Sequence, residues 1–189
     1  MIIPYTTERR HDTGMTNVTL GMWLFIASEV MLFGALFSAY ALLRVSATDW
    51  PSGRQVLNLA IGAVNTLILF QVTASAWRAR RSTGPQARLW LAIGIVSAVV
   101  FLGVKSWEYW HELAAGLRPA TSTFLAMYFT LTGLHALHVI AGIAANAWAI
   151  AGISSVSEGM TAGRTRSLAL YWVFVDIVWL IIFGLMYLV

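Results

Sequence analysis

The sequence contains no cysteine, and only 11% of its 189 residues are charged. The absence of cysteine excludes disulfides and thiolate metal sites, and it gives no information about the redox compartment. A water-soluble domain is about a quarter charged, because its surface must face water. Here 59% of the residues are hydrophobic and 13% are aromatic. The sequence therefore indicates an integral membrane protein.

The first 18 residues are polar and lack the apolar region and the small-residue cleavage site of a secretory signal. We expect residues 1–18 to form a polar arm and the first apolar helix to be permanent. Secretory cleavage is therefore not predicted.

Five apolar stretches follow the arm, and each is long enough to cross a bilayer. A hydrocarbon core of about 30 Å requires about 20 helical residues. The segments between the stretches are short and contain proline, glycine or small polar residues, as surface loops do. The stretches lack the alternation of a membrane β-strand. We predict an all-α bundle in one domain, residues 19–189, with spans at about 19–44, 56–78, 87–110, 123–150 and 168–189.

Basic residues are unevenly distributed between the two sides of this topology. One side carries Arg9, Arg10, Arg78, Arg80, Arg81, Arg88, Arg164 and Arg166, and the other carries Arg44, Arg54, Lys105 and Arg118. The positive-inside rule then places the amino terminus in the cytoplasm. We also expect anionic lipid headgroups to contact Arg78, Arg80, Arg81, Arg164 and Arg166.

One acid, Glu29, lies inside the first span, GMWLFIASEVMLFGALFSAY. A charge near the middle of a membrane helix costs roughly 2.5–3.5 kcal/mol on insertion scales. Its helical neighbours are all apolar: Phe25, Ile26, Leu32 and Phe33. Glu29 is either a protonatable group used in proton movement or a neutral acid that hydrogen-bonds a neighbouring helix. We favour the first interpretation, because intramembrane acids are usually functional.

Other polar residues within the spans favour structural roles. Asp176 lies between Trp172 and Trp179 on one helix face, so we expect an indole N–H to bond this acid. Asn65 shares a face with Asn58 and Gly62, a pattern typical of helix packing.

Two histidines, His135 and His138, are three residues apart in TLTGLHALHVIAG and share a helix face. A metal site needs further ligands, and the chain has four histidines and no cysteine. We therefore expect packing histidines with hydrogen-bond partners on other helices, and no metal.

Lys105 and Glu108 are also three residues apart, near the end of the third span. We predict an interfacial ion pair in which Lys105 extends to the membrane surface. No phosphate-binding loop or nucleophile triad is visible, so we expect neither catalysis by this chain alone nor a nucleic-acid partner.

The spans, taken together, resemble subunit III of the haem-copper terminal oxidases. The matching segments are GMWLFIASEVMLFGALFSAY, SWEYWHEL, TLTGLHALHVIAG and YWVFVDIVWLIIFGLMYL, and they occur in the family's order. The resemblance covers nearly the whole chain after residue 17.

The resemblance implies a subunit that binds no haem or copper and packs against catalytic subunit I, with subunit II nearby. It implies a role in proton uptake and in the durability of turnover, in a prokaryotic cytoplasmic membrane. The family's intramembrane glutamate corresponds to Glu29, its span 4 histidines to His135 and His138, and its other acids to Asp176 and Glu108. Phospholipid between the helices is also implied.

Two features depart from the family pattern. Many members have histidine where this chain has Val173, so any hydrogen bond of that histidine is absent or supplied elsewhere. Longer members have seven helices, and the two additional ones form a wall of a lipid cleft. A lipid cleft in a five-helix chain would need another subunit as its wall.

Three alternatives stay open. The first is a subunit III-like accessory protein of nitric oxide reductase. The second is a small transporter that uses Glu29 and Asp176 as ion sites, although transporters favour internal repeats and broken helices. The third is a membrane enzyme with a metal at His135 and His138. The electron donor of an oxidase, cytochrome c or quinol, is not encoded in these residues.

Overall fold

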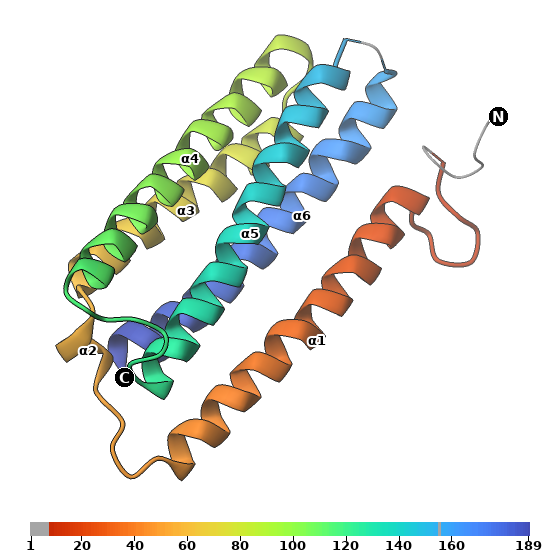
Figure 1. Cartoon of the computed structure of the whole chain (residues 1–189). Coiled ribbons are helices and arrows are strands. Elements are labelled where there is room, and N and C mark those ends of the chain that lie inside the picture. The colour runs from red at the N-terminus through yellow and green to blue at the C-terminus, as the bar shows by residue number, and fades with distance from the viewer. Residues whose placement is uncertain (1–7, 155) are drawn as a thin grey trace.

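The computed structural model describes residues 8–154 and 156–189, and every regular element within these ranges is helical. The elements are α1 (Asn17–Ser46), α2 (Gly53–Val56), α3 (Leu59–Arg80), α4 (Gly84–Ala114), α5 (Thr123–Gly152), α6 (Glu158–Phe183) and a π-helical turn, η1 (Gly184–Leu188) (Figure 1). Five helices are long and apolar enough to cross a membrane. The predicted all-helical, five-span architecture is confirmed.

The last helix begins earlier than predicted. The apolar run starts near residue 168, whereas α6 begins at Glu158. Hydropathy marks only the part of a helix that suits lipid, and the polar segment before it contains no proline to stop a helix. Arg164 and Arg166 therefore lie on α6 and not in a loop.

Polar side chains cap several of the long helices. Thr16 Oγ1 accepts a hydrogen bond from the Thr19 N–H at 3.3 Å, and Ser122 Oγ accepts one from the Leu125 N–H at 3.2 Å. Asn58 Oδ1 accepts from Ala60 and Ile61 at the start of α3. Asn58 is thus a helix cap, and its predicted place on a packing face is wrong.

The polar arm ahead of α1 is described from residue 8, and residues 1–7 of the predicted arm lie outside the described ranges. Within it, Arg10 donates two hydrogen bonds to the carboxylate of Asp12, at 2.8 and 2.9 Å. These bonds lower the pKa of Asp12 to about 2. The arm is thus folded locally, next to the Thr16 cap.

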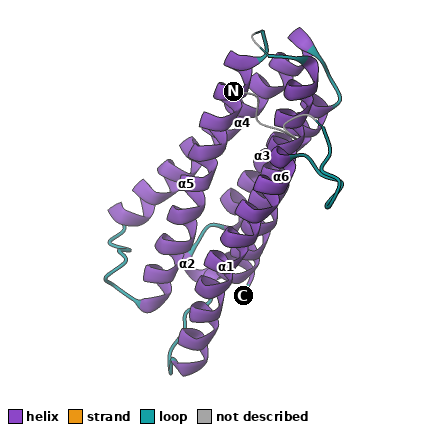
Figure 2. Ribbon diagram, turned by 90° about the vertical axis from the view of Figure 1, so that its right-hand side faces the viewer, coloured by secondary structure: helices purple, strands orange, loops and turns teal. Residues whose placement is uncertain are grey.

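The helices α3, α4, α5 and α6 form a four-helix bundle, and α1 lies along α6 and α5 at its edge (Figure 1). The long helices run along a common direction (Figure 2). Large aromatic side chains fill the centre of the bundle, including the fully buried Trp172 and Trp179. Gly142 makes room for Trp172, because a Cβ there would lie 2.6 Å from the Trp172 ring.

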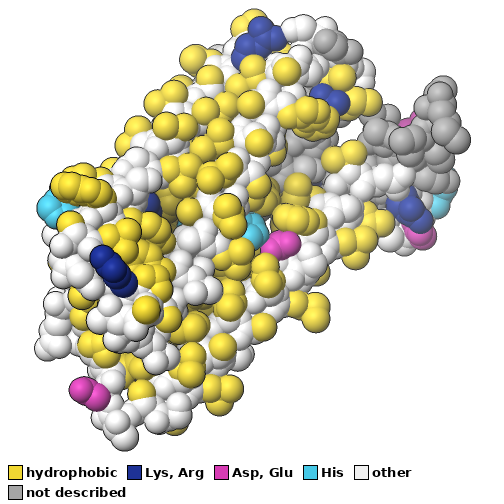
Figure 3. All heavy atoms as spheres, in the orientation of Figure 1, with side chains coloured by type: hydrophobic (Ala, Val, Ile, Leu, Met, Phe, Trp, Pro, Cys, Tyr) yellow, Lys and Arg dark blue, Asp and Glu magenta, His cyan; other side chains and the backbone are white. Residues whose placement is uncertain are grey.

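Helix α1 is much less covered than the other helices. Only 6% of its most apolar 18-residue window is buried, against 56% in the last span. Hydrophobic side chains cover most of the face shown in Figure 3, and basic side chains gather toward the ends. An apolar surface this open must contact lipid or another protein.

Candidate functional site

A polar contact near the middle of α1 joins Glu29 to His138. Glu29 Oε2 lies 3.0 Å from His138 Nε2, although the two residues are 109 positions apart. Each is near the middle of a 30-residue helix, α1 and α5 respectively. Their side chains are 16% and 12% exposed. The pair therefore lies far from both ends of its helices, but its side chains are partly exposed at the lateral surface of the protein.

The hydrogen-bond partners of His138 determine which of its ring nitrogens carry a hydrogen. His138 Nδ1 lies 2.9 Å from the carbonyl oxygen of Leu134. A carbonyl oxygen only accepts, so Nδ1 carries a hydrogen. The contact between Nε2 and Glu29 Oε2 then needs one further proton, on either atom. The pair can be a carboxylic acid with neutral imidazole or a carboxylate with imidazolium, and both arrangements are neutral overall.

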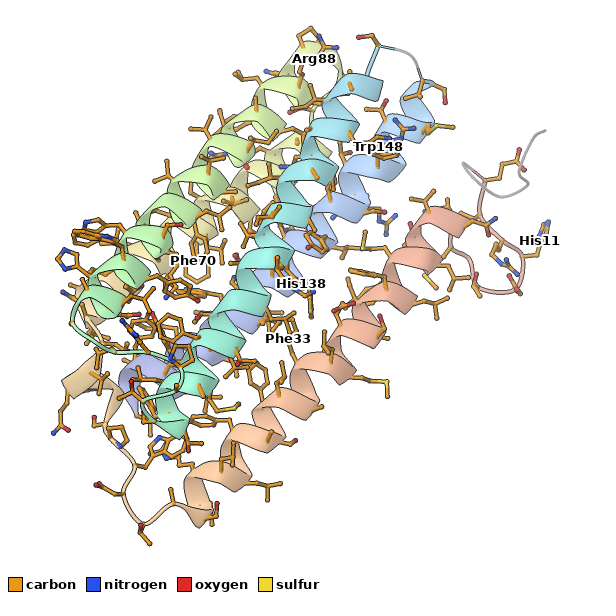
Figure 4. The ribbon with its side chains drawn as sticks, viewed as in Figure 1. His11, Phe33, Phe70, Arg88, His138 and Trp148 are labelled. Atoms are coloured by element: carbon orange, nitrogen blue, oxygen red, sulfur yellow. The ribbon has the colours of Figure 1, made fainter. Side chains whose placement is uncertain are left out.

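Aromatic rings surround this proton-sharing pair. The Phe33 ring centroid is 5.1 Å from that of His138, and the Phe174 ring is 6.5 Å away. The Tyr171 hydroxyl donates to the His138 carbonyl at 2.6 Å, which joins α6 to α5 at this level. His138 and Phe33 lie between α5 and α1 (Figure 4). Figure 3 shows an acidic and a histidine side chain in contact among hydrophobic neighbours.

The other predicted histidine, His135, is in a different environment. It is fully buried, and its ring lies 5.2 Å from the Trp179 ring and 5.9 Å from the Phe101 ring, centroid to centroid. Neither ring nitrogen has a hydrogen-bond partner among the described residues. The expected bond to another helix is therefore missing for His135, while His138 makes one.

The expected indole partners of Asp176 are engaged elsewhere. Trp172 Nε1 donates to Asn146 Oδ1 at 3.2 Å, and Trp179 Nε1 donates to Thr66 Oγ1 at 2.9 Å. The prediction of an indole bond to Asp176 is wrong, because each indole N–H donates to an acceptor on another helix. Asp176 is 6% exposed.

Asn65 is fully buried on α3, as packing on that face requires. Neither amide atom of Asn65 has a hydrogen-bond partner among the described residues. Polar contacts between α3 and α6 are made instead by Thr66, which accepts the bond from Trp179, and by Thr73, which donates to the Trp172 carbonyl at 3.1 Å.

The predicted ion pair between Lys105 and Glu108 is present, but it is buried in the bundle, so the prediction that Lys105 extends to the membrane surface is wrong. Lys105 is 4% exposed, and its Nζ donates to Glu108 Oε2 at 2.9 Å and to the hydroxyls of Tyr128 and Tyr187 at 2.8 Å each. Tyr187 donates in turn to Glu108 Oε1 at 2.7 Å, and Tyr128 donates to Glu112 Oε1 at 2.9 Å. Two tyrosines from α5 and η1 supply the partners that allow burial.

The predicted lipid-contacting arginines lie at the opposite end of the bundle from this network. Several rest on aromatic rings: Arg78 on Trp90 at 4.7 Å, Arg80 on Trp77 at 4.8 Å, and Arg164 on Trp148 at 4.0 Å from the ring centroid. Arg164 and Trp148 also line a cavity of about 300 Å³, together with Ser167 and apolar residues.

A second cavity, of about 350 Å³, lies between α1 and α6. Its lining is apolar and includes Val173, with Phe33, Phe37, Phe174, Ile177 and Ile181. Val173, where the resemblance implies histidine, therefore lines this apolar groove.

No group of three or more histidine, aspartate or glutamate side chains in the described ranges could hold a metal ion. What the Glu29–His138 pair offers chemically is a site for one shared proton.

Comparisons with known proteins agree over more than nine tenths of the chain. The family model described as cytochrome c oxidase subunit III matches residues 5–189. Subunit 3 of cytochrome bo(3) ubiquinol oxidase from Pseudomonas aeruginosa is 33% identical and covers 96% of this chain and 88% of the relative. Subunit 3 of cytochrome c oxidase from Bacillus sp. (strain PS3) is 28% identical, over 98% of this chain and 92% of the relative. A heme-copper oxidase subunit I+III from Aeropyrum pernix is 35% identical over 92% of this chain, which spans 23% of that relative.

Proposed function

The chain belongs to the cytochrome c oxidase subunit III family, and from this premise we propose that it supports proton uptake and durable turnover in catalytic subunit I. Subunit III of an oxidase works in a complex with subunit I. Haem and copper belong to partner subunits, and this chain supplies none of their ligands. It acts in a prokaryotic cytoplasmic membrane, beside subunits I and II.

The Glu29–His138 pair carries this proposal. A neutral pair that shares one proton can move that proton between its two partner atoms without placing a net charge in the membrane. Loss of its shared proton would leave a net charge of −1 at mid-membrane, a change that a proton donor or acceptor nearby would feel strongly. The position of the proton between Glu29 and His138 thus depends on the electrostatic field of an adjoining subunit. A change in that position alters the field in the adjoining subunit in turn.

The exposure of α1 supports subunit I as the neighbour of this pair. The relative from Aeropyrum pernix, named as a fused subunit I+III, carries both parts in one chain. The open face of α1 gives a surface long enough for transmembrane helices to pack along. In the assembled oxidase, subunit I covers α1 and makes Glu29 inaccessible to lipid.

Phospholipid completes the proposed environment. The groove between α1 and α6 is apolar enough for an acyl chain, and Val173 keeps it free of polar atoms. Arg164, together with Arg78, Arg80, Arg81 and Arg166, gives positive charge for anionic headgroups. A partner helix along α1 supplies the outer wall of the groove.

The experiment is Glu29→Gln in the assembled oxidase. Glutamine keeps the size and a hydrogen bond to His138 but cannot exchange an acid proton. We expect slower proton uptake and fewer turnovers before inactivation, with unchanged haem and copper spectra. Asp49→Asn, at an exposed loop acid, is the matched control. Unchanged uptake and turnover in Glu29→Gln would refute the proton role, and collapsed metal spectra would show a structural role instead.

The family assignment favours this function over a transporter or a metal enzyme. The relatives are divided between quinol and cytochrome c oxidases, so the electron donor is set by other subunits. Copurification of the chain with its partner subunits, followed by their haem spectrum, identifies the oxidase type and separates an oxygen reductase from a nitric oxide reductase.

A further inference from the structure

The buried network around Lys105 has one carboxylate more than it has cations. One ammonium and two carboxylates, Glu108 and Glu112, give a net charge of −1 when all three are ionised. Glu108 is compensated, because both its oxygens accept hydrogen bonds, from Lys105 and from Tyr187. Glu112 is the uncompensated acid.

Glu112 is buried without a full set of partners. The residue is 7% exposed, its Oε1 accepts from Tyr128, and its Oε2 has no hydrogen-bond partner among the described residues. A buried carboxylate oxygen left without a donor is costly. The missing donor has room to bind, because Glu112 and Glu108 line a cavity of about 230 Å³.

The walls of this cavity select the kind of cation. Besides the two acids they include Trp107, His111 and Asn58, and otherwise only apolar side chains, Val56, Ile61, Ala115 and Leu117. A calcium ion needs six to eight oxygen ligands, and no cluster of three metal-ligating side chains is found in the described ranges. An ammonium group needs one or two acceptors and is attracted by an aromatic face.

Lys105 shows that this part of the protein already binds such a group. Its Nζ is bonded to one carboxylate and two hydroxyls. It also lies 4.7–5.6 Å from the ring centroids of Tyr109, Tyr128, Trp179 and Tyr187. We propose that the cavity at Glu112 and Glu108 binds a second primary ammonium group, supplied by a ligand.

The position of the cavity indicates where the ammonium comes from. Trp107 and Trp110, in the last turns of α4, are 51% and 65% exposed, as is typical of side chains at a membrane interface. The headgroup of an ethanolamine phospholipid lies at this level of a membrane, and a small soluble amine is the second source. This inference does not rest on the proton-uptake proposal, because it uses other residues and a binding readout.

The test uses the full chain in phosphatidylcholine nanodiscs. Phosphatidylethanolamine is added in one arm and ethanolamine chloride in the other, and retained ligand is counted by native mass spectrometry. We expect Glu112→Gln to weaken retention by about tenfold or more, as for the loss of a charged hydrogen bond. The control Asp49→Asn removes an exposed acid and should bind as the wild type does. Ala115→Leu, which fills the cavity but keeps both acids, should also lose binding.

Each outcome decides the proposal. Glu112-dependent retention of the lipid identifies a headgroup site, and Glu112-dependent retention of ethanolamine alone identifies a soluble amine; both support an ammonium site. If neither amine shows binding that depends on Glu112 and Ala115, the proposal is overturned and a proton alone compensates the acid. If Glu112→Gln unfolds, lost binding in Ala115→Leu supports the site, and unchanged binding in that variant overturns it.

Discussion

Replacing Lys105 by methionine distinguishes between two arrangements of this side chain: the buried network seen in the structure and the interfacial ion pair that the sequence predicts. Methionine keeps the length and apolar stem of the side chain but removes the ammonium. Glu108 then keeps only the Tyr187 hydroxyl as donor, and the Tyr128 and Tyr187 hydroxyls each lose a donor.

The burial of Lys105 sets the size of the effect. Breaking a buried ion pair by removing one partner costs about 3–5 kcal/mol, because an uncompensated charge stays behind. An exposed pair is worth about 0–1 kcal/mol. With Lys105 and Glu108 at 4% and 3% exposure, we expect the larger loss in the free energy of unfolding.

The assay is equilibrium unfolding of the full chain in mixed micelles. Arg118→Met, at an exposed cation beyond α4, is the control and should change the free energy by about 0.5 kcal/mol or less. Adding Glu108→Gln to Lys105→Met should recover part of the loss, with a coupling energy of about 0.5–3 kcal/mol. Two results would mean that Lys105 is not the buried counter-charge of Glu108. One is a loss in the free energy of unfolding below about 1 kcal/mol for Lys105→Met. The other is a loss in the double variant that exceeds the sum of the losses in the two single variants.

Two other changes test the packing and the groove. Gly142→Ala places a Cβ 2.6 Å from the Trp172 ring and should lower the free energy of unfolding by about 1–3 kcal/mol in the same assay. The control Gly103→Ala, where a Cβ would have nothing within 4 Å, should be neutral or stabilising. Equal effects of the two substitutions would contradict the close approach of α5 and α6. Val173→Trp fills the groove between α1 and α6 and should reduce the phospholipid retained by the purified oxidase, while Val99→Trp on an exposed face should not. Unchanged lipid content in Val173→Trp would exclude the groove as an acyl-chain site.

The spans could be predicted from the sequence because lipid imposes one rule on all of them. Length and apolar content are sufficient to place five helices to within a few residues, except at α6. There the polar residues from Glu158 onward continue the helix beyond the apolar run. Hydropathy indicates which part of a helix suits lipid, but it does not mark the ends of the helix. The helix ends where a cap or a turn stops it.

The contacts between helices could not be predicted in the same way. Glu29 has only apolar neighbours on its own helix, so its partner had to come from another helix, and the rotation of α1 relative to α5 decides which one. The depth of Glu29 and His138 in their spans was the available signal. For Lys105, the two tyrosine partners are 23 and 82 residues away, and no local spacing indicates them.

Nitrogen-15 NMR of His138, in the full chain in lipid, measures the shared proton most directly. The Leu134 carbonyl beside Nδ1 predicts that Nδ1 carries a hydrogen. Sharing of one proton with Glu29 predicts that the Nε2 resonance shifts in Glu29→Gln while the Nδ1 resonance stays unchanged. A His138 ring with Nδ1 unprotonated, or an Nε2 resonance indifferent to Glu29→Gln, would contradict the pair on which the proposed function depends.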